Sequence, residues 1–233
     1  MKMKKILSLA LAVVISSTVL VGCGAKKSDT SSSIQTEQSE SVGKVSLKNP
    51  IYIDKKDKSV TILGKVNGKY FTEPTRHFMV YEEGKNGDKA VITGLGNQVK
   101  FYDALKEIGA EAGNNMTVDN KTKTHVKGDK LKVTVTWDGA KKDYDINDVV
   151  KDSNNKKIDM RFGGNLKASE KFNTGCIACL DSCPVGIVSN STYTYGAVEK
   201  RDEVKFFGNS KVLPKDGTLV AVKFELESPC CHN

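Results

Sequence analysis

Three cysteines are grouped within eight residues in the second half of the chain, in the pattern Cys-x₂-Cys-x₃-Cys-Pro. Thiolates bind zinc and iron–sulfur clusters, and outside the cytoplasm thiols also form disulfides. A second group of thiols follows near the end of the chain, next to a histidine. We therefore expect the functional region to be a cysteine-rich loop at 173–196 joined by this tail, with Cys176, Cys179, Cys183, Cys230 and Cys231 as metal or disulfide residues and His232 and His77 as additional ligands.

One interpretation of the motif is an iron–sulfur site. The bacterial ferredoxin motif is Cys-x₂-Cys-x₂-Cys-x₃-Cys-Pro, and this chain matches its last three cysteines and its proline, Pro184. Asn173 stands where the first cysteine would be. A cluster here would need Cys230 or Cys231 as a further ligand. The beginning of the chain, described below, carries the pattern of an export signal, and a chain exported unfolded cannot carry an assembled cluster. The spacing favours this interpretation, whereas export argues against it.

A second interpretation is a closed site for zinc or another soft metal. If the segment before Pro184 is helical, thiolates at i, i+3 and i+7 share one face of the helix and three ligands converge. The fourth ligand would then come from the tail or from His77. Such a site would contribute to folding directly.

The third interpretation is disulfide chemistry. The pair Cys176-x-x-Cys179 has the spacing of a redox motif, although no thioredoxin-like βαβ pattern surrounds it. One or two plain disulfides would instead tie the loop to the tail and stabilise the fold by about 3–4 kcal/mol in the chain-entropy model. No nucleophile–base–acid set accompanies these thiols, so we expect a binding or accessory protein rather than an enzyme, with a redox protein as the alternative.

The beginning of the chain carries the pattern of a bacterial lipoprotein signal. Three lysines within Met1–Lys5 precede an apolar run from Ile6 to Val21, which ends at Gly22-Cys23. A charged region followed by an apolar region is typical of a secretory signal, and small residues before the cysteine resemble a lipobox. We expect residues 1–22 to be removed and Cys23 to carry lipid, including palmitate. This would place the protein on the extracytoplasmic face of the cell membrane.

The segment 23–45 is expected to be a flexible tether, because it is rich in serine and poor in large apolar residues. The remaining residues, 46–233, are expected to form one globular domain. The chain has 36 Lys and Arg against 28 Asp and Glu, a net charge of +8, but no basic block resembles a nucleic-acid arm. The expected partners are the membrane, through the lipid, and a cell-envelope protein, with no nucleic acid.

Turn signals predict a domain rich in hairpins. Asn-Gly and Asp-Gly pairs favour tight turns, and they occur at Asn67-Gly68, Asn86-Gly87, Asp138-Gly139 and Asp216-Gly217. The third pair, Asp138-Gly139, is flanked by segments in which apolar and polar residues alternate. Across this hairpin, Tyr144 is expected to face Val133. Other predicted strands are 51–53, 60–66, 78–81, 90–92, 158–162 and 219–226.

One helix is predicted between Asn97 as N-cap and Gly109 as stop, with Val99, Tyr102 and Leu105 on one face. The expected fold class is α+β, with mainly antiparallel strands and hairpins and one or two packed helices in a single domain.

Several of these stretches together resemble the YdjY domain, a family of exported bacterial domains and lipoproteins of which some are labelled ferredoxin-like. The similar segments are Arg76-His77-Phe78-Met79-Val80, residues 100–105 with 108–110 and 113–115, and Gly175 to Pro184. The likeness covers residues 48 to 227 approximately. It implies a single domain in an extracytoplasmic location, and it brings no established activity.

Overall fold

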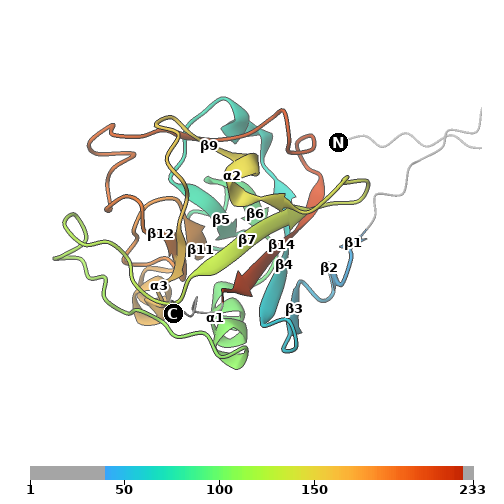
Figure 1. The fold of residues 1–233 in the computed structure, drawn as a ribbon, viewed down its shortest axis with the longest axis horizontal. Helices are drawn as coiled ribbons and strands as arrows, with labels where there is room; N and C mark the ends of the chain where they lie inside the picture. The colour runs from blue at the N-terminus through green and yellow to red at the C-terminus, as the bar shows by residue number, and fades with distance from the viewer. Residues whose placement is uncertain (1–39, 228–233) are drawn as a thin grey trace, which may run out of the picture. The chain divides into compact units, whose positions relative to one another are not determined.

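Strands dominate the computed structural model, which describes residues 40–227. These residues form the strands β1 Ser41–Val42, β2 Val45–Ser46, β3 Ile51–Asp54, β4 Ser59–Val66, β5 His77–Tyr81, β6 Ala90–Gly94, β7 Leu131–Thr136, β8 Tyr144–Asp145, β9 Val150–Asp152, β10 Met160–Phe162, β11 Cys176–Cys179, β12 Val188–Asn190, β13 Phe206–Gly208 and β14 Leu219–Leu226. The helices are α1 Gln98–Glu107, α2 Ile146–Val149, α3 Leu166–Phe172 and the 3₁₀ turn η1 Gly68–Phe71. Figure 1 shows the arrangement of these elements.

Ten of the strands form one mixed sheet in the order β10-β12-β11-β5-β6-β4-β14-β7-β8, with β3 also paired to β4. Most pairs are antiparallel, but β5 with β6 and β11 with β12 are parallel. The sheet curls until β10 approaches β7, where a bridge joins Lys130 to Arg161. The predicted α+β class is therefore corrected to a mainly-β fold, because the longest of the three α-helices has only ten residues.

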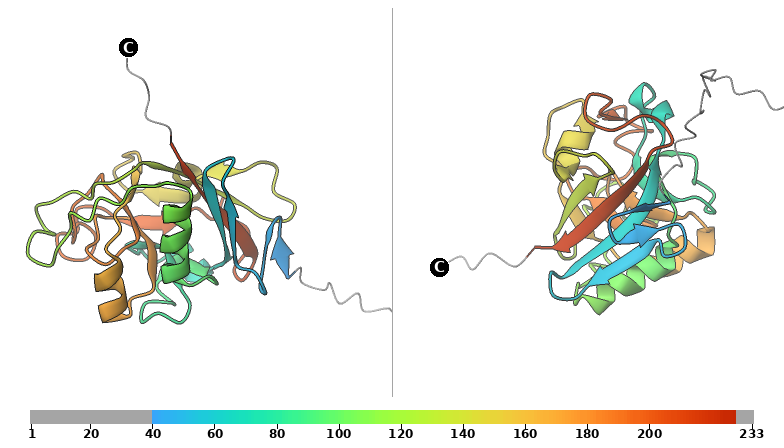
Figure 2. Two further views of the ribbon diagram at one scale, coloured as in Figure 1. Left: turned by 90° about the horizontal axis from the view of Figure 1, so that it is seen from below. Right: turned by 90° about the vertical axis from the view of Figure 1, so that its right-hand side faces the viewer.

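The core lies between the sheet and α1. Within this core, Phe101 of α1 contacts Phe224 of β14, and their ring centroids are 4.8 Å apart. The predicted N-cap is confirmed, because Asn97 Oδ1 accepts hydrogen bonds from the backbone N–H groups of Val99 and Lys100. Gly109 follows the helix with φ +88°, as a helix stop requires. The buried face of α1 is centred on Phe101, Ala104 and Leu105. Figure 2 shows α1 and α3 side by side.

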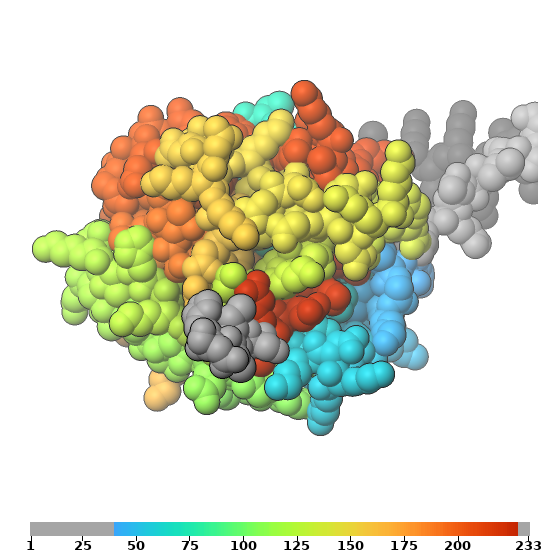
Figure 3. All heavy atoms as spheres, viewed as in Figure 1, coloured from blue at the N-terminus to red at the C-terminus, as the bar shows by residue number. Residues whose placement is uncertain are grey.

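The hairpin of β7 and β8 is confirmed, but its predicted register is wrong by two residues. Tyr144 pairs with Val135 rather than with Val133. The turn is thus longer than a two-residue loop, and the ring of Tyr144 stacks on Trp137 at 5.0 Å. This aromatic pair stabilises the register. Farther along the chain, the segment through β8, α2 and β9 lies across the upper middle of the face seen in Figure 3.

Asn86-Gly87 does not form the predicted hairpin, because the strands on either side of it are parallel. β5 and β6 pair His77 with Ala90 and Tyr81 with Gly94. The connection 82–89 therefore returns along the length of the strand instead of reversing it. An Asn-Gly pair favours a tight turn, but it does not determine which strands pair.

The predicted tether 23–45 extends too far toward the domain. Val42 and Val45 belong to the small hairpin of β1 and β2 and are almost fully buried. They pack with Leu63 and Ala221 against the outer face of the large sheet. Two valines in a serine-rich segment are too few to predict a strand. They are nevertheless buried, because they cover Leu63 of β4 and Ala221 of β14.

Residues 40–227 all lie in one compact unit. Among the helices of these residues, none combines the length and the apolar character that crossing a bilayer would need. The predicted signal segment 1–22 and the lipidation site Cys23 lie outside the described residues.

Candidate metal centre

The cysteine motif and His77 meet on two neighbouring strands of the large sheet. β11 carries Cys176 and Cys179, and it runs antiparallel to β5, which begins at His77. Cys179 is paired directly with His77, and Cys176 with Val80. Pairing of the sheet therefore joins residues that are about a hundred positions apart in the sequence.

The two cysteines reach the same side of β11 because the strand is irregular. In a regular strand, residues three positions apart point to opposite faces. Here the register shifts between Cys176 and Ala178 and again between Ala178 and Cys179. Such bulges re-aim side chains. The helix on which the closed-metal interpretation depended does not form, but the convergence of Cys176 and Cys179 is reached by a bulged strand.

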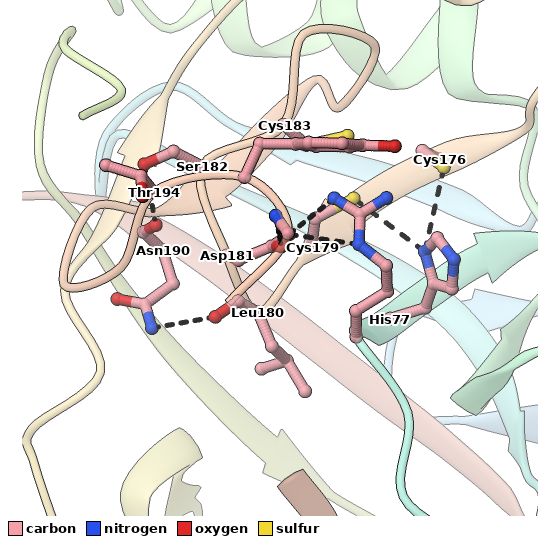
Figure 4. Close-up of polar contacts among 12 residues, drawn as sticks. His77, Cys176, Cys179, Leu180, Asp181, Ser182, Cys183, Asn190 and Thr194 are labelled. Atoms are coloured by element: carbon pink, nitrogen blue, oxygen red, sulfur yellow. Dashed lines mark hydrogen bonds and ion pairs between the residues drawn. The ribbon is translucent and has the colours of Figure 1, made fainter. Parts of the chain in front are cut away.

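The donor atoms of this cluster are close together. His77 Nδ1 lies 3.8 Å from Cys176 Sγ and 3.8 Å from Cys179 Sγ (Figure 4). All three donor atoms lie within 4.8 Å of one another. With Zn–S bonds of about 2.3 Å and Zn–N bonds of about 2.0 Å, the edges of a tetrahedral site are about 3.6–3.8 Å long. The two N···S separations are within a few tenths of an ångström of such an edge, so the cluster fits a single tetrahedral ion after a small adjustment.

The third cysteine of the motif, Cys183, lies at the edge of this group. It is fully buried, and its thiol is close enough to that of Cys179 to affect the ionisation of both. Asn165 holds the loop after Cys183, because its side-chain amide donates to the carbonyl oxygens of Cys183 and Gly186 at 3.1 and 3.2 Å. Cys183 thus lies next to Cys179, outside the group of three donor atoms that lie within 4.8 Å of one another.

A buried ion pair supports the cluster. Arg76, next to His77 on the chain, donates from Nε to Asp181 Oδ1 at 3.1 Å and also from Nη2. The other carboxylate oxygen of Asp181 accepts a hydrogen bond from the backbone N–H of Gly196 at 3.0 Å. The guanidinium also stacks on the ring of Tyr195 at 4.4 Å. Arg76 and Asp181 therefore link the start of β5 to the cysteine motif and to the loop at Tyr195.

The thiols influence one another strongly. Hydrogen bonding from the Cys179 thiol lowers the pKa of Cys176 well below its ordinary value, and His77 adds to this effect against the opposing effect of burial. The same hydrogen bonds with Cys176 and Cys183, together with burial, raise the pKa of Cys179. Burial opposes the charge on Arg76, but the thiolates of Cys183 and Cys179 and the Asp181 carboxylate raise its pKa well above the usual range. The surroundings therefore favour the thiolate form of Cys176 and oppose that of Cys179.

The structure brings together four of the predicted site residues, His77, Cys176, Cys179 and Cys183, all buried. The three cysteines are free thiols, so no disulfide joins any two of them. The remaining predicted residues, Cys23, Cys230, Cys231 and His232, lie outside the described residues.

Sequence reasoning missed the residues that support the cluster. Asp181 lies between two of the cysteines, and a carboxylate inside a buried motif was a signal for a partner cation. Arg76 adjoins His77, but nothing in the sequence connected it with Asp181. Asn165 carried no signal at all, because its role depends on loop packing.

The fold and the site together define a class of protein: a mainly-β domain with a buried cysteine–histidine cluster on a curled mixed sheet. The profile of the YdjY domain matches residues 51–225. A protein of Escherichia coli (strain K12), described as uncharacterized protein YdjY, is 55% identical over 177 residues, which is 76% of this chain and 79% of that protein. This chain belongs to the YdjY family. No solved structure matches it.

Proposed function

We propose that this YdjY domain is a non-enzymatic binding or accessory module of the bacterial cell envelope, built around a closed zinc site. The ligands are His77, Cys176 and Cys179, with Cys183 as the fourth. The observation that carries the proposal is the convergence of three donor atoms within 4.8 Å of one another, with both N···S separations at 3.8 Å. Cysteine and histidine in a Cys₃His set are typical ligands of structural zinc.

Burial supports a structural rather than an exchangeable ion. The three cysteines are fully buried, and His77 is 5% exposed. They pack with Val80, Ala90 and Val185 in an apolar cluster. A closed, four-coordinate site has no open position for a substrate. The metal would instead fasten β11 and the loop after it to β5, and its binding would be coupled to folding.

The cellular location is a second part of the proposal, and it rests on the sequence alone. The signal pattern of residues 1–22 and the lipobox at Cys23 support a lipid anchor on the extracytoplasmic face. More than one acyl chain is needed for stable anchoring. A cell-envelope protein is then the natural partner of the domain.

A redox role is the second candidate, because the Cys-x₂-Cys-x₃-Cys-Pro spacing equals part of the ferredoxin motif. An electron carrier with an iron–sulfur centre would hold iron and inorganic sulfide. A thiol–disulfide partner would hold neither, and would show two thiols that oxidise and reduce reversibly. Convergence of the donor atoms on one point favours the single ion over both.

The test is the metal content of the full-length protein, purified anaerobically from the membrane of its own host. Mass spectrometry should find about one zinc per chain, and thiols should become titratable only after the metal is removed. Cys179→Ser should lose the zinc, whereas Ser191→Ala, which removes a hydroxyl bonded to Asp159 beyond β12, should retain it. Iron with sulfide would instead support the electron carrier. Metal-free protein with disulfides at these cysteines would contradict the zinc site.

A further inference from the structure

Cys179 lies in the middle of a row of three paired residues that crosses three strands. On one side it is paired with His77 of β5, and on the other side with Ser189 of β12. Residues paired directly across neighbouring strands present their side chains on the same face of the sheet. The hydroxyl of Ser189 is therefore carried on the face where Cys179 and His77 meet.

The Ser189 hydroxyl has no hydrogen-bond partner among residues 40–227, although Ser189 is fully buried. A buried hydroxyl without a partner is destabilising, because it loses its hydrogen bonds to water and gains none in return. Its neighbour Ser182 shows the usual situation: the Ser182 hydroxyl is equally buried, accepts from the Val126 N–H at 2.9 Å and donates to the Asn190 carbonyl at 3.3 Å. The Ser189 hydroxyl therefore differs from that of Ser182 in having a donor that is unused within the described part of the chain.

Gly186 shows where that hydroxyl lies. A Cβ on Gly186 would come 2.7 Å from Ser189 Oγ and 3.1 Å from Cys179 Sγ. The two atoms therefore flank the same backbone position, and the absence of a side chain lets this loop close over both. Asn165 holds Gly186 there by its hydrogen bond to the carbonyl oxygen.

We propose that Ser189 is an outer-sphere positioning residue of the metal centre, whose hydroxyl donates a hydrogen bond to the Cys179 thiolate when the site is loaded. The proposal rests on the metal site proposed above and deepens it. A protonated Cys179 is a weak acceptor, but a metal-bound thiolate carries negative charge and accepts strongly. A rotation about the Cα–Cβ bond of Ser189 turns the hydroxyl between staggered positions. Partners of this kind orient metal ligands and tune the metal.

The experiment compares wild-type, Ser189→Ala and Ser182→Ala full-length protein in detergent, each loaded with Co²⁺ as a spectroscopic probe for zinc. Ser189→Ala should lower the affinity for Co²⁺ and Zn²⁺ about tenfold, as loss of an outer-sphere partner does. The thiolate-to-cobalt absorption band should move to longer wavelength, because a sulfur without its hydrogen bond gives up electron density more easily. The metal-free Ser189→Ala variant should be as stable as wild type or more so.

Ser182→Ala is the matched control. It removes a buried hydroxyl that already has partners, so it should lower the stability of the metal-free protein and leave the cobalt band in place. A Ser189→Ala variant with wild-type affinity and an unshifted band would overturn the assignment of Ser189 while the metal site stands. Wild-type protein that takes up neither Co²⁺ nor Zn²⁺ would overturn both.

Discussion

The side chains of Arg76 and Asp181 form an ion pair that is almost completely removed from water, with exposures of 7% and 0%. The guanidinium contributes two donors to one carboxylate oxygen, and the Gly196 N–H donates to the other. Both carboxylate oxygens are therefore satisfied inside the protein. This pair joins the strand that carries His77 to the loop that carries the cysteines, so it holds the two halves of the site in register.

Asp181→Ala should lower the free energy of unfolding by about 3–5 kcal/mol, because it leaves a buried guanidinium without its partner. Replacing both residues, by Arg76→Met with Asp181→Leu, should be much less damaging, because no buried charge then remains. Urea unfolding at neutral pH, with the metal content held equal, measures both. An Asp181→Ala variant whose free energy of unfolding lies within about 1 kcal/mol of the wild-type value would contradict this role for the pair.

Gly175→Ala should displace the start of β11. Gly175 has φ +70°, and a Cβ there would come 2.8 Å from Gly84 Cα and 3.0 Å from the Tyr81 carbonyl oxygen. The control is Gly139→Ala, since Gly139 has φ +83° but no atom within 4 Å of the Cβ position. Backbone strain alone should cost about 1–2 kcal/mol in the control. Gly175→Ala should cost clearly more in thermal or urea unfolding, and equal losses would show that the close approach is unimportant.

Tyr193 should make stability depend on pH in the alkaline range. Burial and the hydrogen bond from its hydroxyl to Asp152 Oδ2 at 2.8 Å raise the pKa of Tyr193 to about 12. In the unfolded chain a tyrosine ionises near a pH of about 10. Between these two values the unfolded state therefore releases a proton that the folded state keeps, and the stability contribution of this phenol is lost as the pH rises.

The measurement is the difference in unfolding free energy between wild type and Tyr193→Phe at several pH values. Below a pH of about 10 the difference should be constant, and it should shrink from there to a pH of about 12, because the phenylalanine of the variant has no proton to release. A difference that stays constant across this range would contradict the raised pKa.

The two thiols at the end of the motif should contribute unequally to metal binding. Cys179 belongs to the group of donor atoms within 4.8 Å, whereas Cys183 lies at its edge. Cys179→Ser should therefore lower zinc affinity by a larger factor than Cys183→Ser in a chelator competition. Wild-type protein should also gain about 4 kcal/mol of stability at a thousandfold excess of free zinc over its dissociation constant. Equal losses of zinc affinity in the two variants would contradict the peripheral place of Cys183 in the site.

Local patterns in the sequence were sufficient for several elements. Asn97 and Gly109 delimit the helix α1, because a cap and a stop act on neighbouring backbone groups. The predicted strand 219–226 is also confirmed, because β14 spans these residues. The cysteine spacing likewise identified the segment in which the candidate site lies.

Tertiary structure decided how these elements combine. The parallel pairing of β5 and β6 and the register of Tyr144 on Val135 depend on contacts between segments far apart or on side-chain stacking, which short patterns do not encode. The fold is mainly β because the helices α1, α2 and α3 are short and the large sheet has ten strands.

The candidate site shows the same division. The sequence alone determined that three thiols lie close together along the chain and that His77 is a ligand type. Only the bulged pairing of β11 with β5 turned Cys176 and Cys179 to the same face and placed His77 between them. A regular strand would have separated these cysteines, so the physical reason lies in the non-local pairing that re-aims them.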